Sequence, residues 1–310
     1  MLAWLNEDER TFEIGDYEGA LPRWCAGCGD HSILAAAQRL LTAEQLRPEQ
    51  TVFVSGIGCS SRFPHYVHAY GFHGLHGRAL PVATGIKLHR PDLHVFVVMG
   101  DGDCCSIGAG HWLHAVRYNL DMVALLLDNS VYALTKNQTS PTTPRGMPTN
   151  TQPYGSYLPA LDPISATLGI TNASFVAQTA EWVPAHLYAT IRAAYHHRGF
   201  AFVRILQRCP VYAPELFQDA VRDRDLIEFL VHEDGVRVPE LERLYTHQRP
   251  HDPRDLNEAR RLAAANDRIR LGVFFRDESR ERYEEVRRVP ARSAPERIRL
   301  LEQELDRYAV

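Results

Sequence analysis

The chain has 310 residues, of which 45% are hydrophobic and 23% are charged, and its formal net charge at pH 7 is −4. This composition is ordinary for a globular protein, and a domain takes roughly 100–200 residues, so the chain can form one large or two modest domains. A weakly acidic chain gives no reason to expect nucleic acid or an anionic membrane surface as a partner. The opening MLAWLNEDER lacks the features of a secretory signal, and no apolar stretch approaches the roughly 18 residues of a membrane span. We therefore expect a cytoplasmic protein.

Strands and helices alternate through the first two thirds of the chain. After a polar N-terminal arm (1–22), the pattern predicts in order a helix over 30–41, a strand over 51–58, a helix over 77–89, a strand over 93–100, a helix over 106–119, a strand over 122–129, a helix over 162–170, a strand over 173–178, a helix over 181–199 and a strand over 200–210. Each strand is a continuous apolar run. This alternation predicts an α/β fold with a mainly parallel sheet covered by helices on both faces.

The last hundred residues differ in character from the rest. Residues 213–310 are richer in Arg and Glu, with expected helices over 256–270 and 294–308 and a strand over 270–277 between them. We interpret them as a C-terminal extension that wraps the core or forms a subunit interface. The predicted organisation is an arm over 1–22, a core domain over 23–212 and this extension.

An acidic glycine turn follows one of the buried strands. Gly100, Asp101 and Gly102 stand between that strand and a helix, where glycines let the backbone approach a phosphate and the helix N-terminus favours it. Asp101 can provide a hard oxygen ligand for Mg²⁺; Asn129, at the end of the next strand, and the carbonyl of Val131 can provide two more. The alternative is a turn in which Asp101 only caps the helix. The glycine patterns of dinucleotide-binding and Walker-type ATP sites are absent from the sequence.

Four of the six cysteines lie in loops beside predicted strand or helix ends. Cys25 and Cys28 form a C-x2-C pair, Cys59 follows a strand, and Cys209 precedes a proline. In the cytoplasm these thiols should be reduced. Four thiolates at one sheet edge suit an iron–sulfur cluster or a structural zinc, and buried, unligated cysteines are the third possibility.

Several strings of the chain resemble, in the same order, the β subunits of 2-oxoacid:ferredoxin oxidoreductases. They are WCAGCGDH, SGIGCSSR, LHGRALPVATGIKL, VVMGDGD, IGAGHWLHAVRYN and DNSVYALTKNQTSPTTP, and they cover roughly residues 22–215. The strings LHGRALPVATG and LTKNQTSPTT are most similar to the 2-oxoglutarate branch, as is RLGVFFRDESRERYEEVR to its C-terminal tail. The thiamine diphosphate (ThDP) motif of such proteins opens with GDG and usually ends in Asn-Asn. This chain has Asp128-Asn129 instead.

The resemblance implies a ThDP-binding, pyrophosphate-domain fold and assigns roles by motif. The implied ligands of one 4Fe-4S cluster are Cys25, Cys28, Cys59 and Cys209, and those of Mg²⁺ are Asp101, Asn129 and Val131. The implied cofactor lining consists of Ile57, Gly58, Cys59, Ser60, His76, Gly77, Gly102, Asp103, Ala133 and Leu134. Arg62 is implied to face the substrate carboxylate, and Lys136 to assist acyl transfer to coenzyme A.

The remaining cysteines and histidines are assigned to packing or to the surface. Cys104 and Cys105 are expected in the first turn of the helix after the glycine turn, as small core residues. His111 and His114 lie three residues apart, which also suits a metal pair, but related subunits have both without a metal. The string YHHRG (195–199) predicts a solvated helix end.

The implied activity is that of the β subunit of a 2-oxoglutarate:ferredoxin oxidoreductase. Such an enzyme reversibly converts a 2-oxoacid and coenzyme A to acyl-CoA and CO₂, passing electrons singly through the cluster to ferredoxin. Because the chain carries only one half of a ThDP site, we expect an α, or fused α-γ, subunit as its partner, in a dimer of αβ heterodimers.

Other functions remain open at this stage. The same chemistry can act on pyruvate or branched 2-oxoacids, although a guanidinium at Arg62 favours a dicarboxylate. A non-redox ThDP decarboxylase subunit with structural zinc is a second possibility. A zinc-stapled regulatory subunit is the third.

Overall fold

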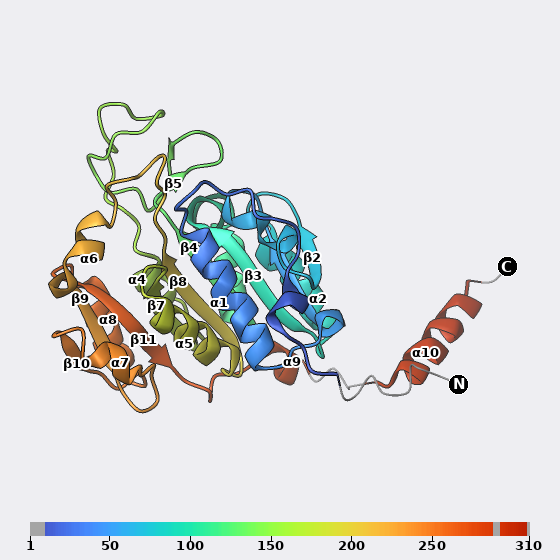
Figure 1. The fold of residues 1–310 in the computed structure, drawn as a ribbon. Coiled ribbons are helices and arrows are strands. Elements are labelled where there is room, and N and C mark those ends of the chain that lie inside the picture. Colours follow the sequence, from blue (N-terminus) through green and yellow to red (C-terminus); the bar gives the residue numbers. More distant parts are fainter. Residues whose placement is uncertain (1–9, 288–291, 309–310) are drawn as a thin grey trace.

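A nine-stranded sheet runs through the body of the protein in a computed structural model that describes residues 10–287 and 292–308 (Figure 1). Its order is β10-β9-β11-β7-β8-β4-β3-β1-β2, and every neighbouring pair is parallel except β11 with β7. The strands are β1 Thr51–Ser55, β2 Tyr70–His73, β3 His94–Gly100, β4 Met122–Asp128, β7 Phe175–Ala180, β8 Phe200–Leu206, β9 Ile227–Val231, β10 Gln248–Pro250 and β11 Ile269–Arg276. β5 (Val131–Tyr132) and β6 (Gln138–Thr139) form a separate hairpin. The predicted mainly parallel α/β fold is confirmed.

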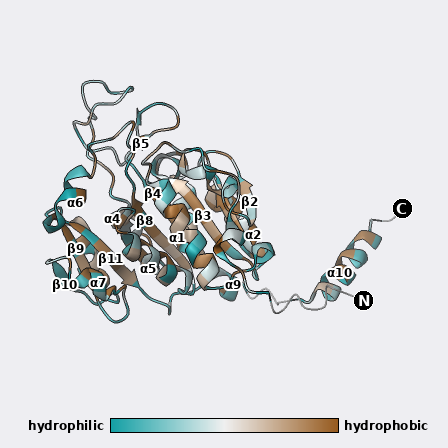
Figure 2. Ribbon diagram, viewed as in Figure 1, coloured by the Kyte–Doolittle hydropathy of each residue, from teal (hydrophilic) through white to brown (hydrophobic). Residues whose placement is uncertain are grey.

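Helices cover both faces of this sheet. They are α1 Asp30–Ala43, α2 Ala79–His89, α3 Ala109–Tyr118, α4 Pro163–Leu168, α5 Pro184–Tyr195, α6 Gln218–Arg222, α7 Pro239–Glu242, α8 Leu256–Ala264, α9 Tyr283–Val286 and α10 Ala294–Asp306. One core contains residues of α1 and α5, and the other contains residues of α2, α3, α4 and α8. Figure 2 shows the mainly hydrophobic central strands between helices that carry both hydrophobic and hydrophilic residues. None of the described helices is long and apolar enough to cross a membrane.

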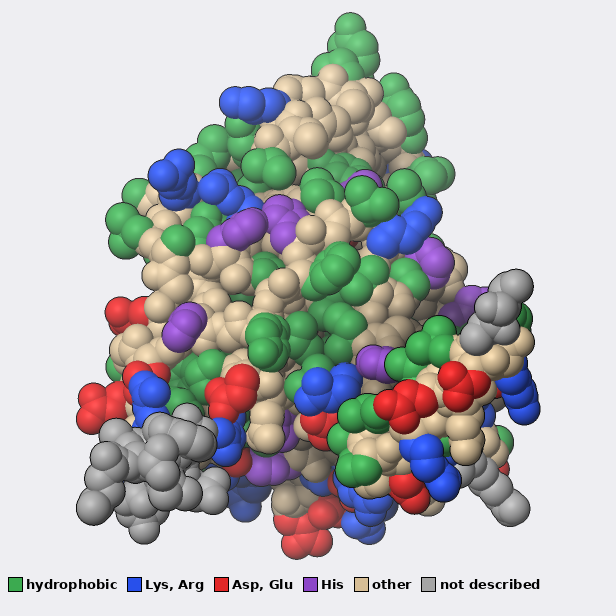
Figure 3. Space-filling view, turned by 90° about the vertical axis from the view of Figure 1, so that its right-hand side faces the viewer, with side chains coloured by type: hydrophobic (Ala, Val, Ile, Leu, Met, Phe, Trp, Pro, Cys, Tyr) green, Lys and Arg blue, Asp and Glu red, His purple; other side chains and the backbone are tan. Residues whose placement is uncertain are grey.

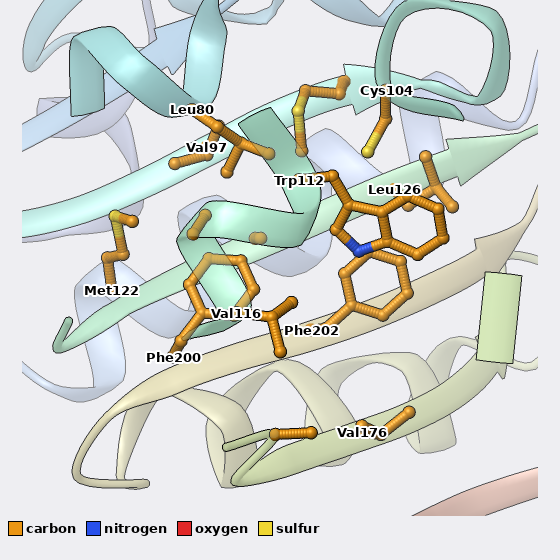
Figure 4. Packing of buried hydrophobic residues seen from close by; sticks show 14 of the residues in the cluster. Leu80, Val97, Cys104, Trp112, Val116, Met122, Leu126, Val176, Phe200 and Phe202 are labelled. Atoms are coloured by element: carbon orange, nitrogen blue, oxygen red, sulfur yellow. The ribbon is translucent and has the colours of Figure 1, made fainter. Parts of the chain in front are cut away.

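Alternate residues of the central strands enter the two cores. Along β3, Val97 joins the core beneath α2 and α3, while its neighbours Phe96 and Val98 join the core beneath α1 and α5. Both sets are apolar because a parallel strand between two helical layers is buried on both faces. Figure 4 shows the first core, where Trp112 of α3 stacks on Phe202 of β8 with ring centroids 5.4 Å apart.

The C-terminal residues continue the sheet. β11 pairs antiparallel with β7, and β9 and β10 extend the sheet beyond it. The expected strand over 270–277 therefore exists, one residue earlier, as β11. The strands β2, β9 and β10 were not predicted. β2 is exposed along its whole length at the sheet edge, so it lacks an apolar run. The predicted helix over 106–119 is two elements, a π-helix over Asp103–Ile107 and then α3.

The prediction of a solvated helix end at 195–199 is wrong for His197. Its side chain is fully buried, and its Nε2 lies 2.9 Å from the Ser174 hydroxyl. The segment after α5 turns inward because β8 begins at Phe200, so His197 packs beneath the sheet while His196 faces solvent. Its ring lies 5.2 Å from that of Phe175.

This burial predicts a loss of stability in mild acid. Burial lowers the pKa of His197 to about 4, below the ordinary value of 6.5. The unfolded chain then binds more protons than the folded one between these values, so the free energy of unfolding falls as the pH drops from 6.5 towards 4. We expect the residue to contribute a loss of about 1 kcal/mol at pH 5.5 relative to pH 7.5. Urea unfolding of wild type and His197→Gln at both pH values measures this contribution. An equal loss of stability in both proteins would contradict the assignment of the pH effect to His197.

Candidate functional site

A cavity of about 230 Å³ opens at the carboxyl ends of β1, β3 and β4. The predicted residues that line it are Ile57, Gly58, Cys59, Ser60, His76, Asp101, Gly102, Asp103, Asn129, Val131, Ala133 and Leu134. Gly100 of the predicted glycine turn also lines it, and Leu127, Tyr132 and Thr135, which were not predicted, complete the lining. The side chains meet because β3 lies between β1 and β4, and parallel strands end at the same edge.

The carboxylate of Asp101 is buried at the end of β3 without a paired cation among the described residues. The hydroxyl of Thr142 lies 2.9 Å from it and 2.8 Å from the carboxylate of Asp128, at the end of β4. Burial, and then the charge of Asp128, raise the pKa of Asp101 to about 7. A bound cation would compensate this charge, so the donor set suits a divalent ion that prefers oxygen ligands.

The carboxylate of Asp128 forms an ion pair with an arginine side chain. The Arg204 guanidinium of β8 contacts its Oδ2, at 2.6 Å from Nη2 and 2.8 Å from Nε. The same guanidinium lies 3.1 Å from the carboxylate of Asp162, the N-cap residue of α4. Asp128 therefore serves as a structural anion, and Asn129 beside it is the residue that faces the cavity.

The turn after β4 brings Asn129 and Val131 to the cavity. Ser130 adopts a left-handed conformation, with φ of 61°, which reverses the chain directly after Asn129. The amide oxygen of Asn129 accepts from the backbone N–H of Val131, at 3.2 Å. Both residues line the cavity, so the three predicted Mg²⁺ ligands lie around one space.

The carboxylate of Asp103 fastens two loops of the cavity together. Its Oδ1 accepts from the backbone N–H groups of Ile57 and Gly77, at 3.2 and 2.6 Å, and lies 2.6 Å from Nδ1 of His76. Gly77 does not line the cavity, and its backbone N–H instead holds its loop to the carboxylate of Asp103. Burial raises the pKa of Asp103.

Gly102 leaves the space that Tyr132 fills. The Tyr132 hydroxyl donates to the carbonyl of Gly102 at 3.0 Å. A Cβ atom at Gly102 would stand 2.2 Å from the Tyr132 ring, so only glycine allows this approach. Tyr132 was not predicted, although it lies within the string DNSVYALTKNQ that carried the resemblance.

The four predicted cluster cysteines are free thiols beside this cavity. Cys59 borders the cavity and also packs with Cys209, Val131 and Ala133. The loop of Cys25 and Cys28 reaches the same edge, where the N–H of Gly29 donates to the carbonyl of Arg208 at 3.2 Å. Cys59 is therefore shared between the cavity and the cysteine group.

Burial raises the pKa of two of these thiols. It raises the pKa of Cys59 to about 12 and also raises that of Cys28, and the charge of Asp30 is the next contribution in both cases. Within the described parts of the chain, no three His, Cys, Asp or Glu side chains are grouped to hold a single metal ion. Four free thiols from three loops at one edge remain a donor set that suits an iron–sulfur cluster, which is larger than an ion.

Arg62 and Lys136 lie outside the cavity lining. The guanidinium of Arg62 lies 5.8 Å from the centre of the Tyr66 ring, one turn after Cys59. Lys136 is exposed, with φ of 81°, in the loop between β5 and β6. Neither position places the side chain at the cavity, and both roles remain predictions.

Cys104 and Cys105 are buried and belong to the core beneath α2 and α3. Figure 4 shows Cys104 in this core. Their predicted packing role agrees with this position. His111 and His114 lie on α3, and the described residues form no metal group around them.

Comparison with known proteins agrees with this geometry. Residues 56–205 match the thiamine pyrophosphate enzyme C-terminal TPP-binding domain, and residues 241–290 match the family of C-terminal regions of the pyruvate ferredoxin oxidoreductase β chain. The β subunit of 2-oxoacid:ferredoxin oxidoreductase 2 from Aeropyrum pernix is 37% identical over 267 residues, which cover 85% of this chain and 82% of that protein. The chain belongs to the family of 2-oxoacid:ferredoxin oxidoreductase β subunits.

Two further members of this family are informative. The 2-oxoglutarate oxidoreductase subunit KorB of Mycobacterium tuberculosis is 48% identical over 200 residues, which cover 64% of this chain and 53% of that protein, so the match spans about half of its length. A solved structure of 2-oxoglutarate:ferredoxin oxidoreductase from Magnetococcus marinus, with 2-oxoglutarate, coenzyme A and succinyl-CoA bound, aligns with a TM-score of 0.80 and 33% identity. It covers 94% of this chain and 96% of the other. The predicted resemblance is confirmed, and so is the thiamine pyrophosphate-binding domain.

Proposed function

We propose that the chain is the β subunit of a cytoplasmic 2-oxoglutarate:ferredoxin oxidoreductase. Together with an α-type subunit it would convert 2-oxoglutarate and coenzyme A to succinyl-CoA and CO₂, with ferredoxin as the electron acceptor. The observation that carries this proposal is the position of Cys59, which borders both the cavity of Asp101 and the group of free cysteines. The Mycobacterium tuberculosis and Magnetococcus marinus relatives, by their names, support 2-oxoglutarate as the substrate.

The residues of the cavity fit ThDP with Mg²⁺. Asp101, Asn129 and the carbonyl of Val131 would hold the ion, and the glycine turn after β3 would receive the diphosphate. ThDP supplies the carbanion chemistry of decarboxylation, and a 4Fe-4S cluster on Cys25, Cys28, Cys59 and Cys209 supplies one-electron transfer. The chain itself would position these groups next to each other through Cys59.

The exposed apolar side chains at the rim of the cavity favour contact with a companion subunit. Ile57 and Leu134 line the cavity and remain 37% and 47% exposed. Figure 3 shows the face at the right of Figure 1. Hydrophobic and histidine side chains lie across the middle of this face, and acidic side chains lie mostly towards its lower part. Apolar side chains at a site mouth are typical of a surface that a partner covers. We assign residues 23–212 to cofactor binding and 213–310 to contacts between subunits, to which the exposed Leu301 of α10 would contribute.

The test is anaerobic purification of the chain together with its companion subunit, followed by measurement of iron, sulfide, zinc and ThDP. We expect about four iron and four sulfide per β chain, one ThDP, and dye reduction that needs both 2-oxoglutarate and coenzyme A. The chain purified alone is the control and should not turn over. Zinc without iron would eliminate the electron-transfer role, and faster reduction with pyruvate than with 2-oxoglutarate would change the substrate.

A further inference from the structure

The side chain of Gln207 lies against one of the proposed cluster ligands. Its Nε2 is 3.3 Å from the sulfur of Cys28 and 2.7 Å from the carbonyl oxygen of Arg208. The carbonyl identifies the amide nitrogen, because an amide oxygen in this place would face another acceptor. Both N–H bonds of the amide are thus used, one on the backbone and one on the sulfur.

The fold holds Gln207 rigidly in this place. The residue follows β8 and is 1% exposed, and its backbone N–H donates to the carbonyl of Asp128 at 2.9 Å. Its side chain packs on Gly29, where an added Cβ atom would stand 2.9 Å from Cγ of Gln207 and 2.6 Å from Cγ of Glu181. The absence of a side chain at Gly29 therefore lets the cysteine loop approach the amide. Gln207 contacts the end of β4 through its backbone and the cysteine group through its side chain.

We infer that Gln207 is a positioning residue that raises the reduction potential of the cluster through an N–H···S hydrogen bond to Cys28. This inference rests on the proposed function, since it needs the cluster to be present. A reduced cluster carries one more negative charge than an oxidised one, so a donor aimed at a ligand sulfur stabilises the reduced form more. Burial strengthens the effect because water cannot replace the lost donor. Among the described residues, no other side-chain N–H group donates to the sulfurs of the four cysteines.

The test compares the holoenzyme with its Gln207→Met and Gln38→Met variants. Methionine keeps the length of the side chain and removes the amide. Gln38 of α1 is also buried and donates to a backbone carbonyl, of Tyr17, so it controls for loss of a buried amide away from the cysteines. A redox titration followed by electron paramagnetic resonance gives the midpoint potential. We expect Gln207→Met to disfavour reduction roughly tenfold, a fall of ~59 mV for a one-electron couple, and Gln38→Met to leave the potential unchanged.

The outcomes separate this inference from the proposed function. An iron-free wild-type protein would overturn both. A loaded cluster whose potential is the same in wild type and Gln207→Met would overturn the role of Gln207 alone, as would an equal fall in both variants. If Gln207→Met does not retain iron, wild-type protein labelled with ¹⁵N in its glutamine amides decides the matter. A ¹⁵N coupling to the reduced cluster supports the hydrogen bond, and its absence rejects it.

Discussion

Asp101→Ala should weaken Mg²⁺-dependent binding of ThDP by about 10³-fold or more and lower turnover with it, since the ion would hold the diphosphate at the glycine turn and a bound metal ion contributes several kcal/mol. The same substitution should not destabilise the ligand-free protein. Burial and the nearby charge of Asp128 raise the pKa of Asp101 to about 7, so its ionised form is disfavoured in the folded state at neutral pH. The combination of lost binding and retained stability distinguishes a metal ligand from a helix cap. Calorimetric titration with ThDP and Mg²⁺, together with thermal unfolding, measures both.

Asp92→Ala is the matched control for this variant. Asp92 precedes β3 at the opposite sheet edge, is exposed and pairs with Arg90 at 2.6 Å. Its loss should leave ThDP binding unchanged. If Asp101→Ala binds ThDP and Mg²⁺ as tightly as wild type, the metal does not lie at the end of β3. If it unfolds more easily without ligand, Asp101 has a mainly structural role.

The position of the site followed from the sequence because its parts stand at strand ends. Asp101 follows β3 and Asn129 follows β4, and a short π-helix and α3 connect these strands. A strand-helix-strand unit of this kind places two parallel strands side by side, so both ends reach one edge. The same reasoning brought Cys59, which follows β1, to this edge. Local pattern and chain topology were sufficient for this part.

The side chains that support the site could not be predicted in the same way. Thr142 approaches Asp101 from a loop 41 residues away, and Arg204 approaches Asp128 from a strand 76 residues away. Each pairing depends on the path of a loop or on the order β4-β8 in the sheet, and no local spacing encodes it. Arg204 also accounts for the Asp-Asn variation of the motif, because its guanidinium compensates the charge that an asparagine would lack.

Short exposed strands and one buried histidine were also not predicted correctly from the sequence. β2 pairs with β1 at the sheet edge through four exposed residues, so its sequence carries no apolar run. His197 was assigned to solvent because a His-His-Arg-Gly string usually is, yet the strand that follows brings it inside. Arg62 and Lys136 were assigned by resemblance alone; neither lines the cavity, and both roles stay predictions.

Cys209→Ser should remove the cluster and leave the ThDP site intact. Cys209 is buried, packs against Ala133 and Val131 of the cavity wall, and shares this contact with Cys59. Serine is a poor ligand for iron compared with a thiolate, so we expect most of the iron and the dye reduction to be lost. The bound ThDP should remain near one per chain, because Asp101 and Asn129 are unchanged.

Cys105→Ser is the matched control for this prediction. It makes the same chemical change at a buried cysteine of the core beneath α2 and α3, where a hydroxyl costs about 1–3 kcal/mol of stability. That variant should unfold more easily and keep its full iron content, whereas Cys209→Ser should lose most of its iron. Equal iron in wild type and Cys209→Ser would remove Cys209 from the ligand set. Loss of iron in Cys105→Ser without loss of stability would overturn its assignment to the core. Iron and ThDP content therefore separate the two kinds of cysteine, because only one kind lies where the loops after β1 and β8 meet.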